Sequence, residues 1–120
     1  MNMPDNDDLQ QLIATIRAFM TARDWEQFHS PKNLSMALGV EAAELMEHFQ
    51  WLTNDESREL TPEALGRVRD EIGDVLVYLL RLCDVLEINP VSAAAEKMVK
   101  NEAKYPVAKS KGNARKYTDL

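Results

Sequence analysis

The sequence predicts an all-α protein, a four-helix bundle that ends in an extended C-terminal arm. Two observations favour this fold class. Apolar residues recur at spacings of three and four along most of the chain, as they do on the buried face of a helix. No segment alternates polar and apolar residues in the manner typical of a strand. At 120 residues, with no repeat or linker, a single domain over residues 1–120 is expected.

The first helix is expected to begin near Asn6 and to end before Asp24. This prediction depends on an amphipathic stripe that buries one face of the helix. The stripe consists of Leu9, Leu12, Ile13, Ile16, Phe19 and Met20. The aromatic-rich segment 25–29 then leads to the next helix.

The second and third helices are predicted from matching start signals. Ser30-Pro31 and Thr61-Pro62 each combine a hydroxyl that caps a helix with a proline, which needs no amide partner in the first turn. The predicted helices cover residues 31–51 and 62–87. The polar residues 53–60 between them are expected to form a loop.

The third helix contains the apolar run 75–80, so we expect it to lie centrally in the bundle or at a subunit interface. A fourth helix is expected to start at Asn89-Pro90 and to end before Tyr105, because proline at 106 disfavours helical geometry in the preceding residue. After Pro106 the sequence loses its periodicity, which predicts the extended arm.

Charge and composition exclude several classes of protein. The net charge of −6 argues against a protein that binds duplex nucleic acid, which needs a basic face to neutralise phosphates. Residues 1–11 lack the basic start and apolar core of a signal peptide, and no apolar stretch reaches the roughly 18 residues that cross a membrane. Cys83, the only cysteine, lies in an apolar run and is expected to be a buried, inert thiol. We therefore expect a cytoplasmic protein that binds no membrane.

Five carboxylates on two predicted helices form the candidate site. Glu41, Glu44 and Glu47 lie on the second helix, and Glu71 and Asp74 lie on the third. A step of three residues keeps both members of a pair on one helix face, and these pairs border the apolar stripes instead of opposing them. Clustered carboxylates need a cation, and oxygen ligands favour Mg²⁺, with Mn²⁺ as a substitute. The alternative is that these acids form solvated faces.

Two other metal sites fit the sequence poorly. A di-iron bundle needs a Glu-x-x-His step, and His48 follows Glu44 by four residues. A calcium loop needs a ladder of Asp and Asn around a central glycine, which no segment provides. His48 is therefore expected to lie at the surface or behind the ligands.

The sequence resembles a known family. Glu41-x-x-Glu44 followed by Glu71-x-x-Asp74 is similar to the acidic signature of the MazG-like all-α nucleotide pyrophosphohydrolases. Residues 23–29, 49–51 and 116–120 resemble the dCTP pyrophosphatase branch. The resemblance implies hydrolysis of a nucleoside triphosphate, most closely dCTP, to the monophosphate and pyrophosphate. It implies that Glu41, Glu44, Glu71 and Asp74 hold Mg²⁺, and that Glu44 or Glu47 activates water.

The resemblance also implies a base pocket, phosphate contacts and an oligomer. Nucleobases stack on aromatic rings. The expected substrate-binding residues are Trp25, Glu26, Gln27, Phe28, His29, Trp51 and Tyr78, with Lys97, Asn101 and Lys104 of the fourth helix as phosphate partners. Members of this branch form homotetramers, dimers of dimers, and a partner would help stabilise so short a domain. Where this branch carries a histidine, nine residues before Trp25, the chain has Ile16, so base preference is expected to differ or broaden.

Two readings compete with a dCTP pyrophosphatase. One is a MazG-like enzyme with another or broader preference, such as dATP or dUTP. The other is a non-catalytic helical interaction module whose acids only aid solubility. Magnesium-dependent release of pyrophosphate separates the enzymes from the module, and a panel of triphosphates separates the two enzymes.

Overall fold

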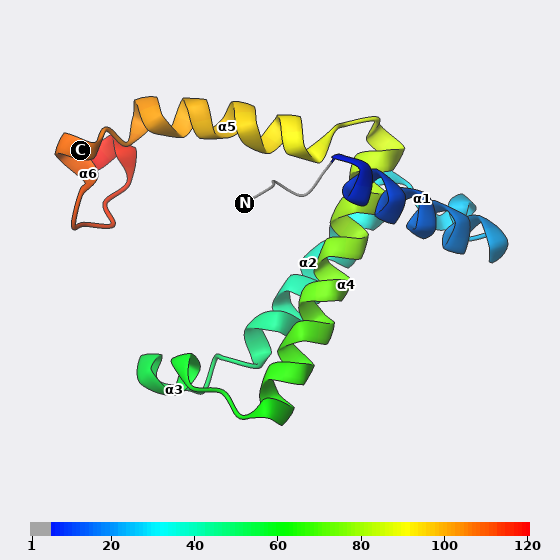
Figure 1. Ribbon diagram of the computed structural model, residues 1–120, viewed down its shortest axis with the longest axis horizontal. Helices are drawn as coiled ribbons and strands as arrows, with labels where there is room; N and C mark the ends of the chain where they lie inside the picture. Colours follow the sequence, from blue (N-terminus) through cyan, green and yellow to red (C-terminus); the bar gives the residue numbers. More distant parts are fainter. Residues whose placement is uncertain (1–5) are drawn as a thin grey trace. The chain divides into compact units, whose positions relative to one another are not determined.

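The computed structural model describes residues 6–120, and within this range every regular element is a helix (Figure 1). The elements are α1 (Asn6–Ala22), the 3-10 helix η1 (Glu26–Phe28), α2 (Pro31–Glu47), α3 (Asn54–Arg58), α4 (Pro62–Leu86), α5 (Pro90–Lys104), α6 (Val107–Ser110) and the 3-10 helix η2 (Tyr117–Asp119). The all-α prediction is confirmed. Residues 1–5, part of the acidic N-terminal segment, lie outside this range. None of the helices within it is long and apolar enough to span a membrane.

The chain divides into two compact units, Met1–Glu87 and Ile88–Leu120, and each is described by itself. In the first unit α2 and α4 lie side by side, and α1 packs against α4 (Figure 1). The core between α1 and α4 consists of Ile13, Ile16, Met20 and Leu80, with Leu9 and Val77 packed against it. Three of the four expected helices therefore pack together in this unit, and the fourth, α5, belongs to the second unit.

Capping groups start three helices at the predicted residues. The hydroxyls of Ser30 and Thr61 each accept a hydrogen bond from the amide three residues later, at 3.1 and 3.2 Å. Asn89 Oδ1 accepts from two amides of the first turn of α5, at 2.9 and 3.1 Å. A proline follows each of these residues, so the first helical position has no amide to satisfy.

The structure corrects the predictions between α2 and α4. Helix α2 ends at Glu47 and not at Trp51, because the Phe49 amide bonds to the carbonyl three residues back and tightens the chain into a turn. The expected loop 53–60 contains α3. Its start is a capping box, in which Thr53 Oγ1 accepts from the Glu56 amide at 3.1 Å and the Glu56 carboxylate accepts from the Thr53 amide at 2.9 Å.

The C-terminal prediction is also corrected. The arm is not extended throughout, because it contains α6 and η2. The ring of Tyr117 meets the ring of Tyr105 edge to face, with centroids 6.1 Å apart, so the end of the chain folds back within the second unit. Helix α4 ends at Leu86, one residue early, because Glu87 adopts the left-handed conformation with φ of 56°.

Candidate active site

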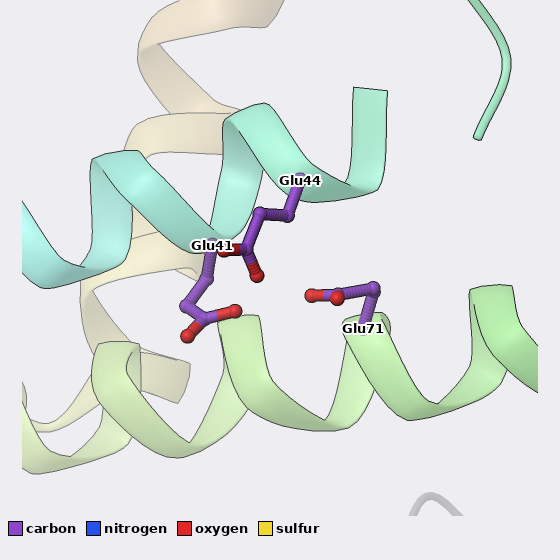
Figure 2. A group of neighbouring side chains, drawn as sticks. All are labelled: Glu41, Glu44 and Glu71. Atoms are coloured by element: carbon purple, nitrogen blue, oxygen red, sulfur yellow. The ribbon is translucent and has the colours of Figure 1, made fainter. Parts of the chain in front are cut away.

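Three carboxylates from two helices converge in the first unit. Glu41 and Glu44 extend from α2 toward Glu71 of α4 (Figure 2). One oxygen from each lies within 4.8 Å of the others, and all three residues are partly buried. The side-by-side packing of α2 and α4 brings Glu41 and Glu44 close to Glu71, and the three-residue step places Glu41 and Glu44 on one face of α2.

Among the described residues, no salt bridge joins a basic side chain to this cluster. The pKa of Glu41 is raised to about 7, first by burial and then by the neighbouring carboxylates Glu44 and Glu71 and the charge of Asp74. Glu41 Oε2 and Glu71 Oε2 are buried and have no hydrogen-bond partner among the described residues. Buried oxygens without partners are costly, and a bound cation would satisfy them and neutralise the repulsion.

The donor set fits a hard divalent cation. All its ligand atoms are carboxylate oxygens, which favour Mg²⁺ or Mn²⁺ over the softer metals that histidine and cysteine select. His48 is not part of the cluster and lines a separate hollow between the end of α2 and the start of α4. The cluster is therefore chemically suited to the metal that the sequence predicts.

The other two predicted acids lie outside the cluster of three. Asp74 is exposed, one turn beyond Glu71 on α4, and its charge still contributes to the raised pKa of Glu41. Asp74 also lines the neighbouring aromatic pocket, so it borders both parts of the site. Glu47 is the last residue of α2 and is exposed.

An aromatic pocket of about 410 Å³ lies beside Asp74. Helix α1, the segment after it and α4 form its walls. It is lined by Leu12, Thr15, Ile16, Phe19, Met20, Trp25, Asp74, Val77 and Tyr78. Trp25 and Tyr78, two of the predicted base-binding aromatics, thus line one pocket. The Trp25 ring meets Phe19 edge to face, with centroids 5.8 Å apart, and Ile16, only 6% exposed, lies in the wall.

The remaining predicted base-binding residues do not line this pocket. Glu26 accepts a hydrogen bond from the Thr21 hydroxyl, and Gln27 donates to Asp24, so both brace the segment that carries Trp25. Phe28 is 59% exposed, and Trp51, beyond the end of α2, is 87% exposed. Their contact with substrate stays a prediction.

His29 belongs to a charged network that sequence reasoning missed. Arg81, 6% exposed, donates from Nε to His29 Nδ1 at 3.2 Å and from Nη1 to Asp84 at 3.1 Å. Arg17 of α1 also donates to Asp84, through two nitrogens. Because Nδ1 of His29 accepts, the proton of the neutral ring lies on Nε2. The sequence does contain a signal for this network, because Arg81 and Asp84 are charged residues within an otherwise apolar run.

The electrostatics of this network are opposite to those of the acid cluster. Hydrogen bonding from Arg17 is the main cause that lowers the pKa of Asp84, and the charges of both arginines act in the same direction. Burial, followed by the charge of Arg81, lowers the pKa of His29. The network therefore favours an ionised Asp84 and a neutral His29.

The predicted phosphate partners lie on α5, in the second unit. Asn101 is partly buried and contacts Met98 Sδ at 3.9 Å. The Lys104 ammonium lies 4.7 Å from the centroid of the Tyr117 ring, and Lys97 is exposed. Their spacing of four and three places them on one face of the helix. Their role toward a triphosphate stays a prediction.

The fold and the site define an all-α protein with a cluster of carboxylates beside an aromatic pocket, and sequence comparison identifies its class. The MazG-like family model matches residues 36–120, which include all five acids. The chain belongs to the MazG-like family.

Individual proteins similar to this chain include dCTP pyrophosphatases and a pyrophosphatase of known structure. The chain is similar to dCTP pyrophosphatase 1 of Mus musculus, with 40% identity over 119 residues that cover 98% of this chain and 68% of the relative. It is 38% identical to dCTP pyrophosphatase 1 of Homo sapiens over the same length, again 68% of that relative. A crystal structure of a pyrophosphatase from Archaeoglobus fulgidus is similar with a TM-score of 0.79 and 48% identity, covering 82% of this chain and 93% of that one.

Proposed function

We propose that this chain is a Mg²⁺-dependent pyrophosphohydrolase that cleaves dCTP, or a modified dCTP, to the monophosphate and pyrophosphate. The carboxylate cluster beside the aromatic pocket is the observation that carries this proposal, because a nucleotide has both an anionic and an aromatic end. The relatives named dCTP pyrophosphatase 1 support the enzyme class and suggest the base.

The metal would be held by Glu41, Glu44 and Glu71, with Asp74 beside them. When bound, Mg²⁺ supplies positive charge against the triphosphate and lowers the pKa of a bound water. Asp74 borders both the cluster and the pocket, so the phosphates and the base of one nucleotide would lie on its two sides.

Hydrolysis needs a base for the attacking water. The water oxygen forms a bond to phosphorus, its proton passes to a carboxylate, and the bond between the α-phosphorus and the bridging oxygen breaks to release pyrophosphate. Glu44 and Glu47 are the candidates for this base. Glu44 lies within the cluster and Glu47 at the exposed end of the same helix, so Glu47→Gln distinguishes them.

The nucleobase of the substrate would lie between the rings of Trp25 and Tyr78, against Ile16. Other residues of the predicted set would complete recognition, namely Glu26, Gln27, Phe28, His29 and Trp51 around the base, and Lys97, Asn101 and Lys104 at the phosphates. Because Ile16 is apolar and buried in the wall, a broader preference that includes dATP or dUTP is the second candidate function.

The enzyme is further proposed to act in the cytoplasm as a homo-oligomer, a dimer of dimers. Leu65, Ile72, Leu79 and Leu86 recur at intervals of seven along α4 and are all exposed in the single chain. A sustained heptad spacing of large apolar residues is typical of a helix that packs against another helix. Equilibrium sedimentation of the purified protein tests the number of subunits.

Pyrophosphate release from a panel of deoxynucleoside triphosphates, with and without Mg²⁺, tests the function. We expect metal-dependent release that is strongest with cytosine nucleotides. Pyrophosphate release from triphosphates with other bases would support the proposed reaction together with the broader base preference. In that case Ile16→His should restrict the activity to fewer bases. Folded protein that is silent with the whole panel would instead favour a non-catalytic interaction module.

A further inference from the structure

The carboxylate of Asp84 is connected to both sides of the segment that carries Trp25, through Arg17 before it and through Arg81 and His29 at its end. Arg17, just before residues 21–29, donates two hydrogen bonds to Asp84. His29, at the end of this segment, accepts from Arg81, which also donates to Asp84. The helix before this segment and the end of the segment are thereby both attached to the last turns of α4, the helix that also contributes Tyr78 to the pocket.

Residues 21–29, the Trp25 segment, are also braced internally. The Trp25 amide donates to the carbonyl of Met20 at 3.1 Å, and Gln27 donates to the Asp24 carbonyl at 3.0 Å. Asp24 adopts a left-handed conformation with φ of 53°, which turns the chain sharply after α1. A short segment that is braced internally moves as one piece, so its two anchored ends determine where the Trp25 ring lies.

We propose that Arg81 and Asp84 are positioning residues that hold the Trp25 wall of the base pocket and thereby set the affinity for the nucleobase. This inference rests on the proposed function. Arg81 follows Asp74 by seven residues, roughly two turns or 10 Å along α4. Neither Arg81 nor Asp84 lines the pocket or belongs to the acid cluster. Their loss therefore changes the shape of the pocket and leaves the metal ligands in place.

Steady-state kinetics with dCTP and Mg²⁺ test the proposal. Arg81→Met keeps the length and apolar stem of the side chain and removes its donors. We expect KM to rise by about tenfold while kcat stays within about twofold, because a displaced wall weakens base contacts without touching the chemistry. Asp84→Asn should act in the same direction, and Arg81→Lys should recover part of the loss. The matched control is Arg58→Met, which breaks the exposed pair with Asp55.

A second readout does not depend on turnover. The chain has two tryptophans, so Trp51→Phe leaves Trp25 as the single tryptophan, whose fluorescence can be excited selectively over that of the tyrosines. In that background, Arg81→Met and Asp84→Asn should lower the fluorescence anisotropy of Trp25 and weaken its quenching by dCMP, whereas Arg58→Met should change neither. A merely stabilising network would change the melting temperature without affecting the anisotropy of the folded protein.

Several results would overturn the inference. These are an unchanged KM in active Arg81→Met, a loss confined to kcat, or an unchanged Trp25 anisotropy. If the variants do not fold, ¹⁵N NMR of the wild-type protein decides, since a proton on Nδ1 of His29 is incompatible with the Arg81 contact. A wild-type protein that hydrolyses no triphosphate would refute the proposed function, and the anisotropy and the dCMP titration would still judge the positioning role.

Discussion

Helix α4 carries two charged clusters that differ in their charge balance. Toward its middle, Glu71 meets Glu41 and Glu44, and no cation of the described chain lies among them. Near its end, Asp84 lies between two guanidinium groups. Folding alone satisfies the second cluster, whereas the first stays repulsive until something positive binds. The comparison indicates that a cluster of unbalanced carboxylates is a candidate ligand site, whereas a balanced cluster holds parts of the fold together.

The largest effect is expected from the unbalanced cluster. Glu41→Gln or Asp74→Asn should lower turnover by about a thousandfold, because several kcal/mol of charge stabilisation depend on the metal. Both variants should keep their helical circular dichroism. Glu63→Gln, in the first turn of α4, is the matched control and should stay active. Near-normal turnover by Glu41→Gln would refute the metal assignment.

Magnesium should stabilise the protein through the same cluster. A ligand that binds only the folded state at a hundred times its Kd contributes about 2.7 kcal/mol to the free energy of unfolding. We therefore expect Mg²⁺ to raise the melting temperature of the wild-type protein and EDTA to reverse the rise. The shift should vanish in Glu71→Gln. A variant that keeps the full shift would show that Mg²⁺ binds elsewhere.

The balanced cluster should respond to mutation through stability. Arg81→Met leaves His29 Nδ1 and one side of Asp84 without a donor, and should lower the free energy of unfolding by about 2 kcal/mol. Arg58→Met removes an exposed pair and should cost less than about 1 kcal/mol. Urea unfolding measures both. Equal losses in the two variants would mean that the Arg81 network is no better than a surface ion pair.

The smallest effect is a pair of opposite pH dependences in metal-free protein. The pKa of Glu41 is raised from 4.5 to about 7, so the folded state retains its proton more tightly, and stability falls as pH rises through this interval. The pKa of Asp84 is lowered, so its contribution is present above its unfolded value of 3.8 and is lost as pH falls below it. Melting temperatures between about pH 3 and 8 should show each slope, weakened in Glu41→Gln and Asp84→Asn respectively. Identical profiles in wild type and variants would contradict both assignments.

Local features of the sequence predicted much of the fold and the placing of Glu41 and Glu44 on one helix face. Helix starts at Ser30, Thr61 and Asn89 depend on neighbouring residues, as does the three-residue step of Glu41 and Glu44, and the structure has these features where they were predicted. The capping box that starts α3 was equally local, from Thr53 to Glu56, and was readable in the sequence.

Other features depend on contacts between distant residues. His29 and Arg81 are separated by 52 positions, and no local pattern links them. The end of α2 at Glu47 was also not predicted, because the local spacing favoured a helix that continues to Trp51. The contact of Tyr117 with Tyr105 was not predicted either, because the sequence after Pro106 favoured an extended arm. The resemblance implied a base pocket, and the packing of α1 on α4 brings Trp25 and Tyr78, out of the larger predicted set, to the lining of one pocket.

A single helix, α4, also sets the spacing between the acid cluster, the aromatic pocket and the Arg81–Asp84 network. Glu71, Asp74, Tyr78, Arg81 and Asp84 follow one another on α4 at steps of three and four, so cluster, pocket and anchor share one rigid frame. Inserting one residue between Asp74 and Tyr78 would rotate everything beyond it by about 100° and shift it by about 1.5 Å. Changes of length in this protein should therefore be tolerated between α2 and α4 and rejected inside α4.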